Sequence, residues 1–136
     1  MKQDDAIMFI ARVLLAQLFL VSGIGKVEAY AATQGYMASM GVPGSALPLV
    51  IVLELGGAAA LLVGLLTRWV ALGLAGFCVG SALLFHLNFA DPAQAINFMK
   101  NISIAGGMLV LYVHGAGEFS VDAVRAGREI RKSRHA

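Results

Sequence analysis

The chain has 136 residues, of which 59% are hydrophobic and only 13% are charged, and its mean hydropathy is +0.80. Soluble globular domains carry roughly 25% charged residues, so these values exclude an ordinary water-soluble domain and indicate an integral membrane protein. The net charge of +2 does not suggest a nucleic-acid partner, and the single cysteine, Cys78, excludes an intrachain disulfide and a cysteine-built metal site.

Four apolar stretches predict membrane helices, at 6–24, 47–66, 69–89 and 98–117. Each is long enough, because a helix needs about 20 residues to cross a bilayer. The leader MKQDD holds more acid than base and no small-residue cleavage site follows, so we interpret the first stretch as a retained helix rather than a signal peptide. None of the four alternates polar and apolar residues with a period of two. We therefore expect an all-α membrane protein, an antiparallel four-helix transmembrane bundle.

The connections refine this division of the chain. The first, residues 26–46, is predicted to hold a short interfacial helix before the turn at Gly41–Gly44. Thr67 and Arg68 are predicted to form a tight turn, and Asp91-Pro92 is a helix-start signal. Residues 1–117 are thus predicted to form the transmembrane domain and 118–136 a basic cytoplasmic tail.

Basic residues predict the orientation. The C-terminal tail contains five of them, and Lys2 and Arg68 lie in segments on the same side, whereas the other two connections offer only Lys26 and Lys100. The positive-inside rule therefore places both termini and the Arg68 turn in the cytoplasm. The tail is expected to rest on anionic lipid head groups, where each basic residue contributes about 1 kcal/mol; the alternative is a tail that docks on a protein.

Small residues predict how the helices pack, because lipid supplies no hydrophobic drive for helices to associate. The predicted packing positions are Gly56, Gly57, Ala60, Gly64, Gly76 and Gly80. On the first helix, the spacing places Arg12, Ala16, Phe19, Gly23 and Lys26 along one seam.

Several polar residues fall inside the predicted spans. With a rise of 1.5 Å per residue, Glu54 is roughly 10 Å below the outer surface. Lys26, His86, Lys100 and Asn101 belong to the same outer half, whereas Arg12 lies in the inner half. A charge at a helix centre costs about 2.5 to 3.5 kcal/mol, so Glu54 is expected to meet a cation from Lys26, Lys100 or Arg12.

Two interpretations of this polar set stay open. An ion pair to Glu54 can simply fix the helix register, or the converging groups can form a ligand pocket open to the outer face. Cys78 is predicted to pack as a small hydrophobe and His114 to lie at the inner interface. The sequence contains no zinc-protease, phosphate-loop or paired-histidine haem motif, and no metal site is predicted.

Three segments carry a family resemblance: FLVSGIGKV, LELGGAAALLVGLLTRW and INFMKNISIAGGMLVLY, with a histidine closing the third helix. Together they resemble the DoxX family of small bacterial membrane proteins, from about Arg12 to Tyr112. The resemblance matches Arg12, Lys26, Glu54, Gly57, Gly64, His86, Lys100 and Asn101 to characteristic positions. It implies a multi-pass protein of the bacterial inner membrane, and some relatives are linked to quinone-coupled thiosulfate oxidation or redox-defence complexes.

From the resemblance and the polar set, we expect a redox-associated accessory subunit that binds a quinone or similar small lipophile. Its partners would be the bilayer and either a second copy of the chain or a redox complex. With no redox cofactor site in the sequence, the chain is not expected to catalyse a reaction alone, although it can be a subunit of a quinone-linked oxidoreductase. The alternatives are a small-molecule transporter and a purely structural membrane partner held by buried ion pairs.

Overall fold

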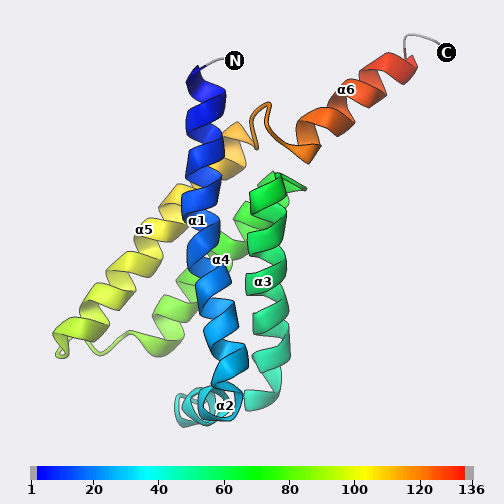
Figure 1. Ribbon diagram of the computed structural model, residues 1–136. Coiled ribbons are helices and arrows are strands. Elements are labelled where there is room, and N and C mark those ends of the chain that lie inside the picture. The colour runs from blue at the N-terminus through cyan, green and yellow to red at the C-terminus, as the bar shows by residue number, and fades with distance from the viewer. Residues whose placement is uncertain (1–2, 134–136) are drawn as a thin grey trace.

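The computed structural model describes residues 3–133, and every regular element in that part of the chain is a helix (Figure 1). The long helices are α1 (Gln3–Glu28), α3 (Leu47–Val63), α4 (Thr67–Phe85) and α5 (Pro92–His114), and all four are long and apolar enough to cross a membrane. The shorter elements are α2 (Tyr30–Ser39), the 3-10 turn η1 (Gly44–Ala46) and α6 (Val121–Ser133). The expected all-α, four-span architecture and the short helix in the first connection are confirmed.

The observed helix ends differ from the predicted ones because capping contacts, rather than hydropathy, decide them. Helix α3 ends at Val63 because Gly64 adopts a left-handed conformation with φ of +69°, which favours glycine. Helix α5 begins at Pro92, as the Asp91-Pro92 signal predicts and six residues before the apolar stretch, and the Asp91 carboxylate accepts a hydrogen bond from the Ala93 N–H at 3.0 Å.

Successive long helices run antiparallel, with α1 beside α3 and α4 beside α5 (Figure 1). The contact between α3 and α4 joins the two helix pairs. The end of the bundle where α2 lies is called here the α2 end, and there α5 diverges from α1 and α3 (Figure 1). The opposite end, where α1 begins and α6 lies, is called the α6 end. The predicted seam of α1 faces the core, since Arg12, Ala16, Phe19 and Gly23 are all buried.

The glycines divide into two groups. A Cβ at Gly57 would lie 3.1 Å from the Leu74 side chain, so Gly57 allows α3 and α4 to approach closely. By contrast, a Cβ at Gly56, Gly76 or Gly80 would meet no atom within 4 Å. The expectation that these three hold helices together therefore needs correction within the described chain, because the small-residue pattern does not tell which helix face turns inward.

The α6 end is closed by contacts between distant segments. The fully buried guanidinium of Arg12 donates hydrogen bonds to the Leu61 carbonyl, at 3.3 Å, and to the Phe119 carbonyl. The Asp122 carboxylate accepts from the backbone N–H groups of Leu66, at 2.8 Å, and Thr67, at 2.9 Å. These bonds attach the beginning of α6 to the first turn of α4, so the tail predicted from residue 118 onward starts as a docked segment.

Asp122→Ala is expected to destabilise the protein by about 1 kcal/mol, because the first N–H groups of α4 lose their cap. Burial opposes ionisation of Asp122, but the Thr67 and Leu66 N–H groups and Arg125 outweigh it and hold the pKa below its usual value. A lowered pKa stabilises the fold above the unfolded-state pKa of about 3.9, and this contribution disappears as pH falls through the folded value. Thermal unfolding should therefore show a difference from wild type at pH 7 that shrinks below about pH 4. Asp4→Ala, at an exposed acid of the same end, is the control; a pH-independent difference would contradict the assignment.

Candidate functional site: a polar cavity at the α2 end

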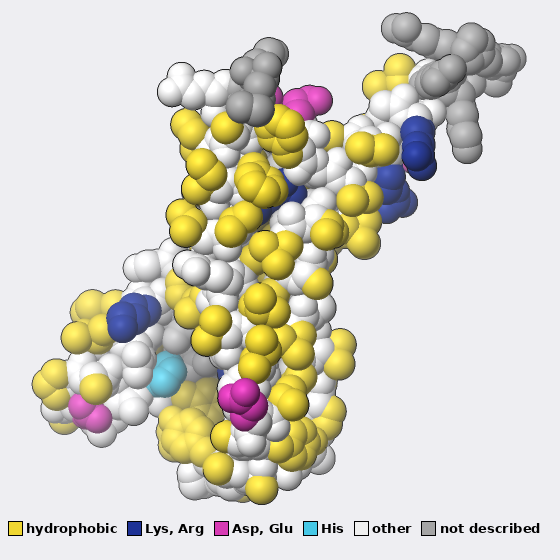
Figure 2. Space-filling model, viewed as in Figure 1, with side chains coloured by type: hydrophobic (Ala, Val, Ile, Leu, Met, Phe, Trp, Pro, Cys, Tyr) yellow, Lys and Arg dark blue, Asp and Glu magenta, His cyan; other side chains and the backbone are white. Residues whose placement is uncertain are grey.

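A cavity of about 660 Å³ lies at the α2 end, bounded by α1, α2, α3, α4 and α5. Figure 2 shows the hollow in the surface on this side of the molecule, between the diverging end of α5 and the body of the bundle. Its walls are mainly aliphatic and aromatic. The polar residues among them are Ser22, Lys26, Thr33, Tyr36, Glu54, Ser81, His86, Asn97, Lys100 and Asn101.

Helical spacing explains why these residues share one cavity. On α5, Lys100 and Asn101 lie three and four residues after Asn97, and Ile104 follows them by four and three, so all four share one face. The lining residues of α4, from Phe77 to Phe85, follow the same spacing. These faces of α4 and α5 lie opposite α1 and α3 at the end where the two helix pairs diverge. Polar groups that are distant in the sequence therefore line one cavity.

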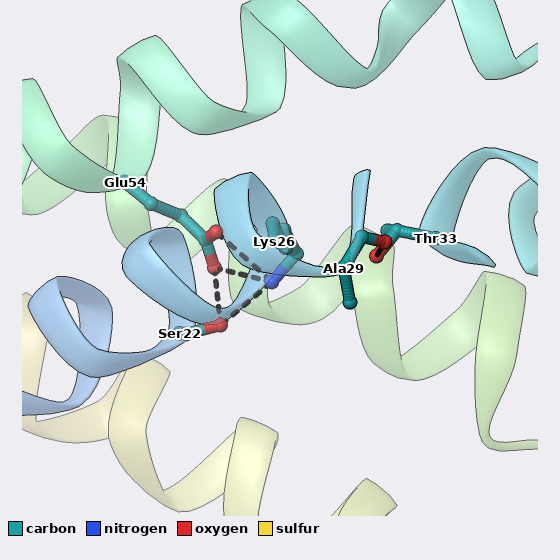
Figure 3. Close-up of polar contacts among 5 residues, drawn as sticks. All are labelled: Ser22, Lys26, Ala29, Thr33 and Glu54. Atoms are coloured by element: carbon teal, nitrogen blue, oxygen red, sulfur yellow. Dashed lines mark hydrogen bonds and ion pairs between the residues drawn. The ribbon is translucent and has the colours of Figure 1, made fainter. Parts of the chain in front are cut away.

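Glu54 is held by two residues of α1 (Figure 3). The Lys26 Nζ lies 2.9 Å from Glu54 Oε2 and 3.1 Å from Oε1. The Ser22 hydroxyl donates to Oε1 at 2.9 Å and accepts from Lys26 at 2.6 Å. Because Ser22 and Lys26 are four residues apart, one turn of α1 supplies both partners.

The exposures of the two charged groups differ. The Glu54 side chain is 2% exposed, whereas that of Lys26 is 26% exposed and reaches the cavity. Of the three cations expected as partners for Glu54, the structure selects Lys26. Arg12 is bound at the α6 end, and Lys100 lies on the exposed side of the cavity.

The remaining predicted residues lie on α4 and α5. His86, the C-cap of α4, places Nδ1 2.6 Å from Gln94 Oε1 and so connects α4 to the first turn of α5. The Asn101 amide donates to the Asn97 carbonyl at 3.0 Å. The cavity thus gathers Lys26, Glu54, His86, Lys100 and Asn101, but not Arg12.

Sequence reasoning missed several polar residues of the site, namely Ser22, Thr33, Tyr36, Ser81, Asn97 and Gln94. Ser22 carried a usable signal, since it lies one turn before Lys26 on the same helix. Gln94 and Tyr36 carried no such signal, because only the fold brings them near the site. The Tyr36 ring stacks on the Phe85 ring, with 5.6 Å between the ring centroids, and so joins α2 to α4. Cys78, predicted to pack, is 1% exposed and lies at the cavity wall.

Comparisons with known proteins agree with this architecture. A sequence model of the DoxX family matches residues 7–87. The inner membrane protein YqjF of Escherichia coli K12 is 50% identical over 121 residues, which cover 89% of this chain and 93% of the relative. The inner membrane protein YphA of the same organism is 33% identical over 123 residues, covering 85% and 88% respectively. No solved structure matches.

Proposed function

The chain belongs to the DoxX family and is an inner-membrane protein, and from this premise we propose that it is a redox-associated accessory subunit whose cavity binds a quinone or similar small lipophile. The observation that carries the proposal is the cavity itself. Its volume of about 660 Å³ falls within the range of small-molecule sites, and apolar walls surround a small number of polar groups.

The chemistry of the lining suits a quinone head group. Quinone oxygens accept hydrogen bonds, and Lys26, Lys100 and Asn101 carry donors at the cavity. The His86 imidazole and the Glu54 carboxylate add hydrogen-bonding groups at the same cavity. The Phe77 and Phe85 rings supply an apolar wall for the ring and tail of the ligand.

Wild-type protein in a mild detergent is expected to carry a quinone or to bind a short-chain quinone analogue, and Glu54→Gln to bind it at least about tenfold more weakly. The reason is that Glu54 orients the Lys26 ammonium at the cavity wall. Native mass spectrometry with lipid extraction measures the bound lipophile, and thermal unfolding with added analogue measures affinity.

His114→Gln is the matched control, since this exposed residue lies at the far end of α5. Wild-type protein that carries no lipophile and does not respond to quinone analogues would contradict the proposed function. Equal binding by wild type and Glu54→Gln would remove Glu54 from the site.

Binding is better supported than transport. The transport hypothesis used Arg12 as the inner end of a path from the outer polar groups. Arg12 is fully buried, and its guanidinium donates to the carbonyls of Leu61 and Phe119. This favours a closed structural role for Arg12 at the α6 end.

We further propose that the α6 end faces the cytoplasm, with the cavity in the outer half of the membrane and residues 118–136 as a cytoplasmic tail. Arg68, Arg125 and Arg128 support this orientation, since basic residues concentrate on the cytoplasmic side. A membrane-impermeant thiol reagent should therefore label a cysteine introduced at Ser39 in intact cells, but not one introduced at Ser133. The reverse labelling would contradict the orientation.

A further inference from the structure

We propose that the cavity selects a lipophile whose head group is a single-charged oxyanion, and that Lys100 is the residue that recognises it. The inference rests on the proposed function in one respect, that the cavity holds a lipophile. It goes further by assigning the charge of the head group and by giving the two cavity lysines different roles.

The cavity lining carries more positive than negative formal charge. Its formally charged lining residues are Lys26, Glu54 and Lys100. Lys26 and Glu54 neutralise each other as an ion pair at 2.9 Å. The net charge of the lining is therefore positive, and this charge resides on Lys100.

Lys26 is already engaged by other residues of the protein. An ammonium group carries three N–H donors. The Lys26 Nζ already contacts Ser22 Oγ at 2.6 Å and the two Glu54 oxygens at 3.1 and 2.9 Å. Two of its donors are thus used within the protein and its charge is neutralised by Glu54, which leaves at most one donor for a ligand.

Lys100 is in the opposite situation. Within the described part of the chain, its ammonium forms no hydrogen bond and has no carboxylate within 4.0 Å. It lies eight residues into α5, roughly 12 Å along the helix from Pro92, and thus within a membrane-spanning segment. Its side chain is exposed at the cavity, where the ammonium can meet an anion.

The surroundings of Lys100 suit an oxyanion with an apolar tail. Asn97 and Asn101 lie on the same face of α5, and the Ser81 hydroxyl lies across the cavity on α4. These groups can donate to the oxygens of a carboxylate or phosphate beside the ammonium. Ile104 and Phe77 continue the wall with apolar surface. A carboxylate-headed acyl chain and an anionic phospholipid share this chemistry.

The experiment titrates full-length wild-type protein in a non-ionic detergent with three probes of one chain length. These are the anion dodecanoate, the neutral ester methyl dodecanoate and the cation dodecyltrimethylammonium. Native mass spectrometry and thermal unfolding measure their binding. Dodecanoate is expected to bind about tenfold more tightly than the neutral ester, and the cation least well. Lys100→Gln should remove the preference for the acid over the ester, and Lys100→Arg should retain this preference. Arg125→Gln, at an exposed basic residue of α6, is the matched control and should behave as wild type.

Two anion sources are then separated by competition. Displacement of dodecanoate by dihexanoyl phosphatidylglycerol, but not by dihexanoyl phosphatidylcholine, would identify a phospholipid head group. Resistance to both would identify a free acid.

Equal affinity of wild-type protein for dodecanoate and its ester would overturn the inference, and this comparison needs no variant that must fold. An equal loss of acid and ester binding in Lys100→Gln would also overturn it. If a neutral quinone analogue binds wild-type protein but no anion preference exists, the proposed function stands and only the inference fails. If no lipophile binds, both fail.

Discussion

Lys26→Met is expected to lower the free energy of unfolding by about 3 to 5 kcal/mol, because it leaves the Glu54 carboxylate buried without its counter-ion. Glu54 is 2% exposed and retains only the Ser22 hydroxyl as a partner in this variant. Glu54→Gln should cost less, at about 2 to 3 kcal/mol, because the Lys26 side chain that it leaves unpaired is a quarter exposed and can reach the cavity. Unfolding by sodium dodecyl sulfate in mixed micelles, followed by circular dichroism, measures both changes.

The double variant Lys26→Met/Glu54→Gln tests the coupling directly. Removing both charges leaves neither group stranded, so the double variant should lose at least about 2 kcal/mol less than the sum of the single losses. Additive losses would show that the two side chains act through other contacts. The same variant separates structure from function: a stable double variant that no longer binds a lipophile would mean that the pair serves the cavity as well as the fold.

Gly64→Ala is expected to destabilise the protein by about 3 kcal/mol, through backbone strain and a collision at the α6 end. The left-handed conformation of Gly64, with φ of +69°, costs an L-residue about 1 to 2 kcal/mol. The added Cβ would also collide with Arg12 Nη1 and with Ser120 Cβ. Arg12 cannot move away without breaking its bonds to the Leu61 and Phe119 carbonyls, and overpacking of this kind costs about 1 to 3 kcal/mol.

Gly56→Ala is the matched control on the same helix, because its Cβ meets no atom within 4 Å and its backbone is helical. It should be neutral or more stable by up to about 1 kcal/mol, since alanine favours helix over glycine. The same mixed-micelle unfolding compares the two variants. A Gly64→Ala protein within about 0.5 kcal/mol of wild type would show that the contact between the α3–α4 turn and the segment before α6 adds little stability.

Hydrophobicity alone determined the number of spans, because each long apolar stretch had to become a membrane helix whatever its neighbours. The same reasoning located the polar residues that such helices tolerate only near a partner, and Lys26, Glu54, His86, Lys100 and Asn101 indeed line one cavity. The seam on α1 was also predictable, since helical periodicity fixes which residues share a face.

Only the tertiary structure decided which partners meet. Three cations were equal candidates for Glu54 by sequence, and the pairing of α1 with α3 selected Lys26 and left Lys100 on the far side of the cavity. Likewise, the small-residue pattern could not tell Gly57, at the contact with Leu74, from Gly56, which faces outward. The attachment of Asp122 to the start of α4 joins residues 55 positions apart. Sequence spacing constrains the faces of single helices, whereas the relative rotation of packed helices depends on the sum of many long-range contacts.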